Sequence, residues 1–146
     1  MKISDFLSPT DVMIDVRSAN KLKLLQELSR QAASTLNVPA ERISSALLNR
    51  EELGCTGMGG GVAIPHARLQ ELKRPFGIFV RLKREMDFGA IDSQPVDLVF
   101  LLLLPAAEGD PLNALASVAR KLRTPEDLIR LRGAKNQAEL YSAIAG

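Results

Sequence analysis

Apolar residues recur along this chain in two different patterns, and each pattern predicts a different kind of element. Residues 12–16, with the sequence VMIDV, predict a short strand. A helix is predicted over residues 20–36, where apolar residues recur at steps of three and four, at Leu22, Leu25, Leu28, Ala32 and Leu36. A second helix is predicted to begin at Pro39, because proline suits the first helical turn, and to stop at Gly54.

The middle of the chain predicts strands. Residues 62–64 indicate a short strand before Pro65, and residues 76–82 indicate another with alternating apolar positions. Residues 96–104 are apolar without alternation from Leu98 onward, which is typical of a strand that is covered on both faces. We therefore expect this strand to lie at the centre of the sheet.

The C-terminal third predicts helices. Residues 124–127 supply the cap and first turn of a short helix that ends near Gly133, and Asn136 with Glu139 resembles a capping box for the last helix. The helix before these carries its apolar face at Leu112, Leu115, Ala119 and Leu122. Strands and helices in this order predict an α/β fold, a sandwich of a central mixed β-sheet with helices packed on its faces.

Composition and length narrow the kind of protein. The length of 146 residues, without a repeat or low-complexity linker, predicts one domain over residues 1–146. The net charge of +2 and the aromatic content of 4% argue against a nucleic-acid partner. The longest apolar run, residues 98–107, is half the roughly 20 residues that a membrane helix needs, so we expect no membrane insertion. The single cysteine and the polar N-terminus favour a cytoplasmic protein.

Candidate chemistry concentrates in residues 54–69, GCTGMGGGVAIPHARL, which contain the only histidine, His66. Pro65 restricts the backbone on both of its sides, so we expect the imidazole at a rigid corner where a strand turns into a loop. Arg50 shares the apolar face of its predicted helix with Ile43 and Leu47, where a guanidinium is costly without an anionic partner.

Glycines in the same stretch allow backbone N–H groups to approach a ligand closely. They are Gly57, Gly59, Gly60 and Gly61. A nucleophilic nitrogen, a bidentate cation and backbone donors could together hold a phosphoryl group, with His66 as its covalent acceptor.

Simpler interpretations of these residues stay open. Glycine runs are most often plain turns, and this one lacks the ending of a phosphate-binding P-loop. Arg50 lies near a helix C-terminus, where a cation offsets the helix dipole. Cys55 as a nucleophile with His66 as its base is disfavoured, because no oxyanion motif accompanies the pair. One histidine and one cysteine suggest no metal ligand set, and we expect no cofactor.

Two stretches resemble a known family. Residues 49–69, NREELGCTGMGGGVAIPHARL, resemble the active-site segment of the fructose/mannitol-type enzyme IIA domains of the bacterial phosphoenolpyruvate phosphotransferase system. Residues 91–105, IDSQPVDLVFLLLLP, resemble a second segment of the same family. The form GCTGMGGGVAIPH is closer to the nitrogen-regulatory enzyme IIA proteins than to the sugar-specific ones.

The resemblance implies a phosphotransferase-system component that accepts a phosphoryl group on Nε2 of His66 from a histidine phosphocarrier protein. It implies that Arg50 binds the phosphate, and that the hydroxyl of Thr56 hydrogen-bonds the phosphoryl group or braces the loop. Gly61 completes the expected phosphate-binding set.

One departure from the family concerns a second active-site histidine, which many members carry in a His-Leu pair. This chain has Pro111 and Leu112 there. Asp110 as N-cap and Pro111 in the first turn would begin the helix well. Without the second imidazole, we expect slower phosphorylation of His66 or a shorter-lived phosphorylated form.

Three hypotheses of function follow. The first is a nitrogen-type enzyme IIA whose phosphorylation state regulates target proteins, for which the resemblance implies transporters and sensor kinases. The second is a sugar-specific enzyme IIA that passes the phosphoryl group to an enzyme IIB. The third is a binding module in which the phosphorylation site has decayed.

Overall fold

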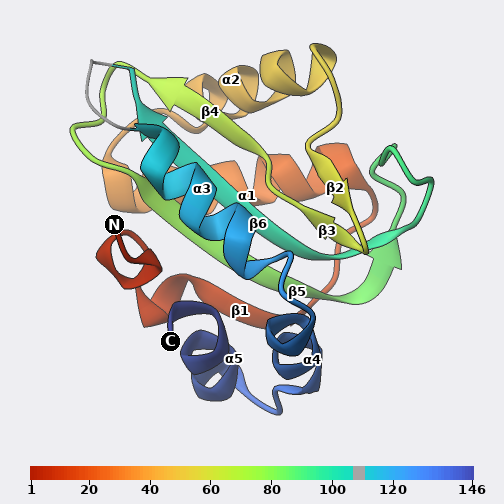
Figure 1. Cartoon of the computed structure of the whole chain (residues 1–146). Coiled ribbons are helices and arrows are strands. Elements are labelled where there is room, and N and C mark those ends of the chain that lie inside the picture. Colours follow the sequence, from red (N-terminus) through yellow and green to blue (C-terminus); the bar gives the residue numbers. More distant parts are fainter. Residues whose placement is uncertain (107–110) are drawn as a thin grey trace.

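The computed structural model describes residues 1–106 and 111–146, and these residues form a six-stranded mixed sheet with helices on both faces (Figure 1). The strands are β1 (Val12–Val16), β2 (Gly57–Gly59), β3 (Val62–Ala63), β4 (His66–Leu69), β5 (Phe76–Met86) and β6 (Val96–Pro105). The helices are α1 (Lys21–Leu36), α2 (Ala40–Glu52), α3 (Pro111–Lys121), α4 (Pro125–Gly133) and α5 (Gln137–Ala145), and 3₁₀ turns at Ile3–Asp5 and Pro9–Asp11 precede β1. The predicted fold class is confirmed.

Strand β6 lies at the centre of the sheet, as its unbroken apolar run predicted. It pairs antiparallel with β5 on one side and parallel with β3 and β4 on the other. Residues 98, 100, 102 and 104 of β6 pack into the core beneath α3, α4 and α5. Residues 99, 101 and 103 point to the opposite face and pack into the core beneath α1 and α2. Both faces of the strand are therefore covered, which explains why its sequence does not alternate.

The sequence predicted the ends of the helices more accurately than the faces that they bury. The Asn20 side chain caps α1 by accepting the Lys23 N–H at 2.9 Å, and Asn136 caps α5 by accepting the Glu139 N–H at 2.9 Å. On α1, however, Leu22 is 47% exposed and Leu24 is fully buried in its place. The expectation for Leu22 was wrong because the neighbouring leucines leave the phase of the apolar face open.

Two expectations in the C-terminal third need correction. Leu122, just after α3, is buried as expected. Within α3, however, Ala114 and Val118 are buried whereas Leu115 and Ala119 are only partly buried, so the buried face of the helix is centred one position earlier than predicted. Thr124 precedes α4 as expected, but its hydroxyl donates to the Arg120 carbonyl and does not cap the helix. The predicted N-cap Asp110 and the side chain of Leu112 lie outside the described residues.

The glycine and histidine segment contains two strands that the sequence did not predict, β2 and β4. Strands β3 and β4 both pair with β6 in one register, since Val62 lies opposite Leu98 and His66 opposite Leu102. Pro65 interrupts this line, although its carbonyl still accepts the Leu102 N–H of β6 at 2.9 Å. His66 therefore begins a short strand and does not lie at a strand-to-loop corner.

Helices in residues 1–106 and 111–146 are all too short or too polar to cross a membrane.

Candidate functional site

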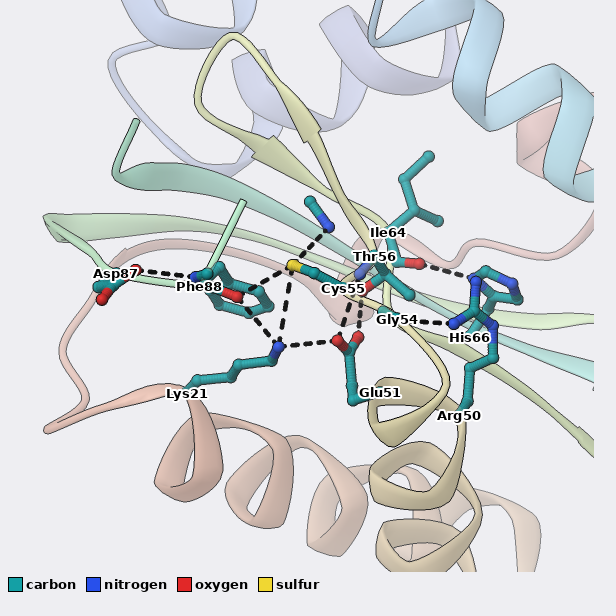
Figure 2. A network of polar contacts seen from close by, with 12 residues as sticks. Lys21, Arg50, Glu51, Gly54, Cys55, Thr56, Ile64, His66, Asp87 and Phe88 are labelled. Carbon is teal, nitrogen blue, oxygen red and sulfur yellow. Dashed lines mark hydrogen bonds and ion pairs between the residues drawn. The ribbon is translucent and has the colours of Figure 1, made fainter. Parts of the chain in front are cut away.

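His66 is held in one tautomer by its own backbone. Its Nδ1 atom lies 2.8 Å from the Ile64 carbonyl oxygen (Figure 2). Because a carbonyl oxygen only accepts hydrogen bonds, Nδ1 must carry the proton, which leaves the lone pair on Nε2. The ring can therefore act as a nucleophile only through Nε2.

The electrostatic surroundings keep this imidazole neutral. Burial of the half-buried ring lowers the pKa of His66 below its ordinary value of 6.5, and the positive charge of Arg50 lowers it further. The hydrogen bond to Ile64 and the negative charge of Glu51 act in the opposite direction without reversing the shift. At neutral pH the ring is thus uncharged.

Arg50 projects from the last turn of α2 toward His66. Its Nη1 donates to the Gly54 carbonyl at 2.9 Å, just beyond the end of the helix. Arg50 and His66 line one cavity of about 480 Å³ between α2, β4, the end of β6 and α3. The other residues that line it are Arg42, Ala46, Asn49, Leu53, Ala67, Arg68, Leu104 and Leu115. The guanidinium therefore sits at the helix C-terminus, as the simpler interpretation held, and also faces the cavity of His66.

Thr56 is buried beside this pair, and its polar groups are already engaged. Its hydroxyl donates to a carboxylate oxygen of Glu51, and its N–H donates to the other oxygen at 3.2 Å. Only 7% of the Thr56 surface is exposed. In this structure the hydroxyl braces the loop after α2 and is not directed at a ligand.

The glycine run forms the turn between β2 and β3. Gly59, Gly60 and Gly61 have φ values of +90°, +65° and +81°, which other residues adopt only with strain. The Gly60 N–H donates to Asp92 at 3.0 Å, and the Gly60 carbonyl accepts from Arg132 at 2.6 Å. The run is therefore explained by a tight turn that other residues hold in place.

Gly61 does not lie near the end of the β3–β4 segment that carries His66, the expected phosphoryl acceptor. It precedes Val62, which pairs with Leu98, whereas His66 pairs with Leu102. Four residues along a parallel strand correspond to about 13 Å. A Cβ at Gly61 would lie 2.6 Å from a nitrogen of Arg132. The absent side chain of Gly61 therefore makes room for Arg132, and the expected phosphate-binding role of Gly61 stays a prediction.

Cys55 forms its hydrogen bonds with residues other than His66. Its thiol donates to the Phe88 carbonyl at 2.9 Å, and its sulfur accepts the Gly57 N–H at 3.1 Å. Cys55 and His66 lie on opposite sides of Thr56 in Figure 2. The described contacts thus give no support to a cysteine nucleophile with His66 as its base. Within residues 1–106 and 111–146, no cluster of three or more His, Cys, Asp or Glu side chains is arranged to hold a metal ion.

Two residues of the site were missed in the sequence. Glu51, with only 7% of its side chain exposed, forms an ion pair with Lys21 at 2.7 Å. Lys21 also donates to the Phe88 carbonyl at 3.1 Å and lies 5.0 Å from the centre of the Phe88 ring. Glu51 could have been noticed in the sequence, because it directly follows Arg50. Its partner Lys21 lies thirty residues earlier and is brought close only by the packing of α1 on α2.

Comparisons with known proteins agree with this fold. The family described as "Phosphoenolpyruvate-dependent sugar phosphotransferase system, EIIA 2" matches residues 5–146, and the chain belongs to this family. It is thus a IIA component of the phosphotransferase-system type, as the two motif segments indicated.

Several relatives share nearly the full length of the chain. A nitrogen regulatory protein from Bradyrhizobium diazoefficiens is 42% identical over 99% of this chain and 95% of its own length. A nitrogen regulatory protein from Escherichia coli is 39% identical over 99% of this chain and 90% of its own length. The crystal structure of nitrogen regulatory protein IIA-Ntr from Neisseria meningitidis has a TM-score of 0.92 and 29% identity, over 97% of this chain and 98% of that one. The mannitol IIA of Escherichia coli has the same fold, with a TM-score of 0.77 at 19% identity over 94% of this chain and 98% of that one.

Proposed function

We propose that this chain is a phosphohistidine carrier of the nitrogen-related phosphoenolpyruvate phosphotransferase system, and that its phosphorylation state regulates target proteins. The observation that carries the proposal is the neutral imidazole of His66, whose Nδ1 proton is bound to Ile64 and whose ring shares a cavity with Arg50. The similarity to nitrogen regulatory proteins over nearly the whole chain supports the regulatory branch of the family.

The phosphoryl transfer would proceed through Nε2. Its lone pair attacks the phosphorus of the donor's phosphohistidine, a new N–P bond forms, and the donor's N–P bond breaks with its electron pair remaining on the donor nitrogen. Positive charge then develops on the ring of His66, and the hydrogen bond from Nδ1 to the Ile64 carbonyl strengthens with it.

Arg50 would neutralise the transferred group. A guanidinium offers parallel donors that match two phosphoryl oxygens, and phosphoryl transfer depends mainly on such positioning and charge neutralisation. Thr56 supports the site by bracing the loop after α2. Helix α3 begins at Pro111, where many relatives carry a second histidine, so slower phosphorylation of this chain than of those relatives stays a prediction.

The proposed partners are a histidine phosphocarrier protein as donor and regulatory targets such as transporters and sensor kinases. A phosphohistidine adds nearly two negative charges to the rim of the cavity. A target that fits the unphosphorylated surface would therefore be released on phosphorylation, because it would have to bury those charges.

Intact mass spectrometry tests the proposal. The chain is incubated with phosphoenolpyruvate, enzyme I and the phosphocarrier protein, beside the variant His66→Ala. We expect a gain of one phosphoryl group that is acid-labile and absent from the variant. A chain that gains none, or gains it equally without His66, would contradict the proposal; the first result would favour a binding module with a decayed site.

A sugar-specific enzyme IIA is the second candidate. The fructose-specific EIIABC component of Bacillus subtilis is 30% identical over 99% of this chain, which makes up 23% of that protein. Incubation of the phosphorylated chain with purified enzyme IIB proteins separates the two candidates. Rapid loss of the phosphoryl group to an enzyme IIB would favour the sugar-specific role, and retention would favour regulation.

A further inference from the structure

Backbone carbonyls hold both reactive groups of the candidate site. The Gly54 carbonyl accepts from Arg50 at 2.9 Å, and the Ile64 carbonyl accepts from the Nδ1–H of His66 at 2.8 Å. Thr56 links the two, because it follows Gly54 by two residues and its own carbonyl accepts the Ile64 N–H at 3.0 Å. A shift of Thr56 would therefore move the supports of both Arg50 and His66.

Glu51 in turn holds Thr56 in place. One carboxylate oxygen accepts the Thr56 hydroxyl, and the other accepts the Thr56 N–H at 3.2 Å and the Lys21 ammonium at 2.7 Å (Figure 2). A buried carboxylate is costly unless hydrogen bonds and a counter-charge satisfy it. Here three donors from two segments satisfy it, so the carboxylate is held from both sides.

We infer that Glu51 and Thr56 are positioning residues for phosphoryl transfer, which act on Arg50 and His66 through the Gly54 and Ile64 carbonyls without touching the phosphoryl group. The inference rests on the proposed phosphorylation of His66. Phosphoryl transfer needs its reacting atoms in line, and a misplacement of about 1 Å can cost about 100-fold in rate. Lys21 completes the arrangement by balancing a carboxylate that would otherwise repel the arriving phosphoryl group.

Single-turnover phosphoryl transfer from the phosphorylated phosphocarrier protein, measured over a range of donor concentrations, tests the inference. The variants are Thr56→Val, which removes the hydroxyl and keeps the shape, and Glu51→Gln, which removes the charge. We expect the maximal rate to fall by about 10- to 100-fold in both, with the half-saturating donor concentration unchanged, because neither residue meets the donor.

Two controls accompany these variants. Thr56→Ser keeps the hydroxyl and is expected to retain most of the rate. Glu52→Gln removes the same charge from the next residue of α2, which is exposed, and is expected to match the native chain. All rates are compared at a temperature at which circular dichroism shows every variant to be folded.

Nuclear magnetic resonance of the single imidazole supplies a readout that does not depend on activity. In the native chain we expect a slowly exchanging Nδ1–H signal, and in Thr56→Val and Glu51→Gln faster exchange or a mixture of tautomers. Native rates and an unchanged Nδ1–H signal in both folded variants would overturn the inference while leaving the proposed function intact. An equal loss of rate in Thr56→Ser and Thr56→Val would also overturn it. If the native chain accepts no phosphoryl group, the proposed function fails and the inference fails with it, whatever the Nδ1–H signal shows.

Discussion

Replacement of Lys21 by methionine isolates the contribution of the ion pair beneath the candidate site. The Lys21 ammonium lies 2.7 Å from the Glu51 carboxylate, and 25% of the lysine side chain is exposed against 7% of the glutamate side chain. Methionine keeps an unbranched apolar stem, one atom shorter than the lysine side chain, but removes the charge and the donors. Glu51 would keep only its two hydrogen bonds from Thr56.

The size of the effect follows from these contacts. Removal of one partner from a fully buried pair costs about 3–5 kcal/mol. The partial exposure of Lys21 and the remaining bonds from Thr56 reduce this to about 2 kcal/mol. The lost cation–π contact with Phe88 and the sulfur–aromatic contact that methionine can form are of similar size, about 0.5–1 kcal/mol, and largely cancel. At about 2–4 °C per kcal/mol for a chain of this length, the melting temperature should fall by about 4–8 °C.

Urea unfolding of Lys21→Met, Lys23→Met, Glu51→Gln and the double variant of Lys21 and Glu51 measures this directly. Lys23 is an exposed lysine on the same turn of α1 and serves as the matched control. We expect the double variant to lose at least about 1 kcal/mol less than the sum of its single variants, as for residues in direct contact. Equal losses in Lys21→Met and Lys23→Met, or losses that simply add, would refute the stabilising role of the ion pair.

Three further predictions concern His66, the glycine turn and Arg50. Burial lowers the pKa of His66 below 6.5, so its contribution to stability is present above pH 6.5 and is lost as the pH falls through the folded-state pKa. The unfolding free energy of the native chain relative to His66→Gln should therefore decrease on acidification, and a pKa above 6.5 in an imidazole titration would contradict this. Gly61→Ala, which combines a positive φ with an overlap against Arg132, should cost more unfolding free energy than the roughly 1–2 kcal/mol expected for Gly60→Ala, where the added Cβ meets open space. Neither should change the rate at which His66 accepts a phosphoryl group, and a loss of rate specific to Gly61→Ala would support a phosphate-binding role for Gly61. Arg50→Gln should lower that rate by about 10²–10³-fold while Arg68→Gln, in the same cavity, leaves it nearly unchanged, and equal losses in the two variants would argue against a specific role for Arg50.

The parts of the fold that sequence reasoning located correctly depend on contacts within one element. Asn136 caps α5 through a backbone group three residues away, as its capping-box pattern predicted, and an apolar run as long as residues 98–104 requires cover on both faces. Strand β4 was missed because proline usually ends a strand, whereas here the strand resumes beyond Pro65 in the same register.

The candidate site likewise has parts that could be predicted from the sequence and parts that could not. The order Arg50, glycine run, Pro65, His66 could be read directly from the chain, and it led to the family to which the chain belongs. The glycines, however, could be read either as backbone donors to a phosphoryl group or as a plain turn, because their flexibility is a local property. Their neighbours Asp92 and Arg132, which show that the run is a braced turn, come from distant segments.

The sequence alone thus determined an α/β sandwich with a central apolar strand. It also placed the single histidine, His66, after an arginine, Arg50, that lies near the end of a predicted helix. Only the tertiary structure decided that Glu51 holds the hydroxyl of Thr56, that Lys21 pairs with Glu51, and that Gly61 lies far from His66. The physical reason is the range of the interactions. Helix caps and apolar periodicity act over a few residues and leave a mark in the sequence, whereas an ion pair between two helices or a distance along a sheet depends on packing angle and strand register. Those quantities are set by the whole core at once.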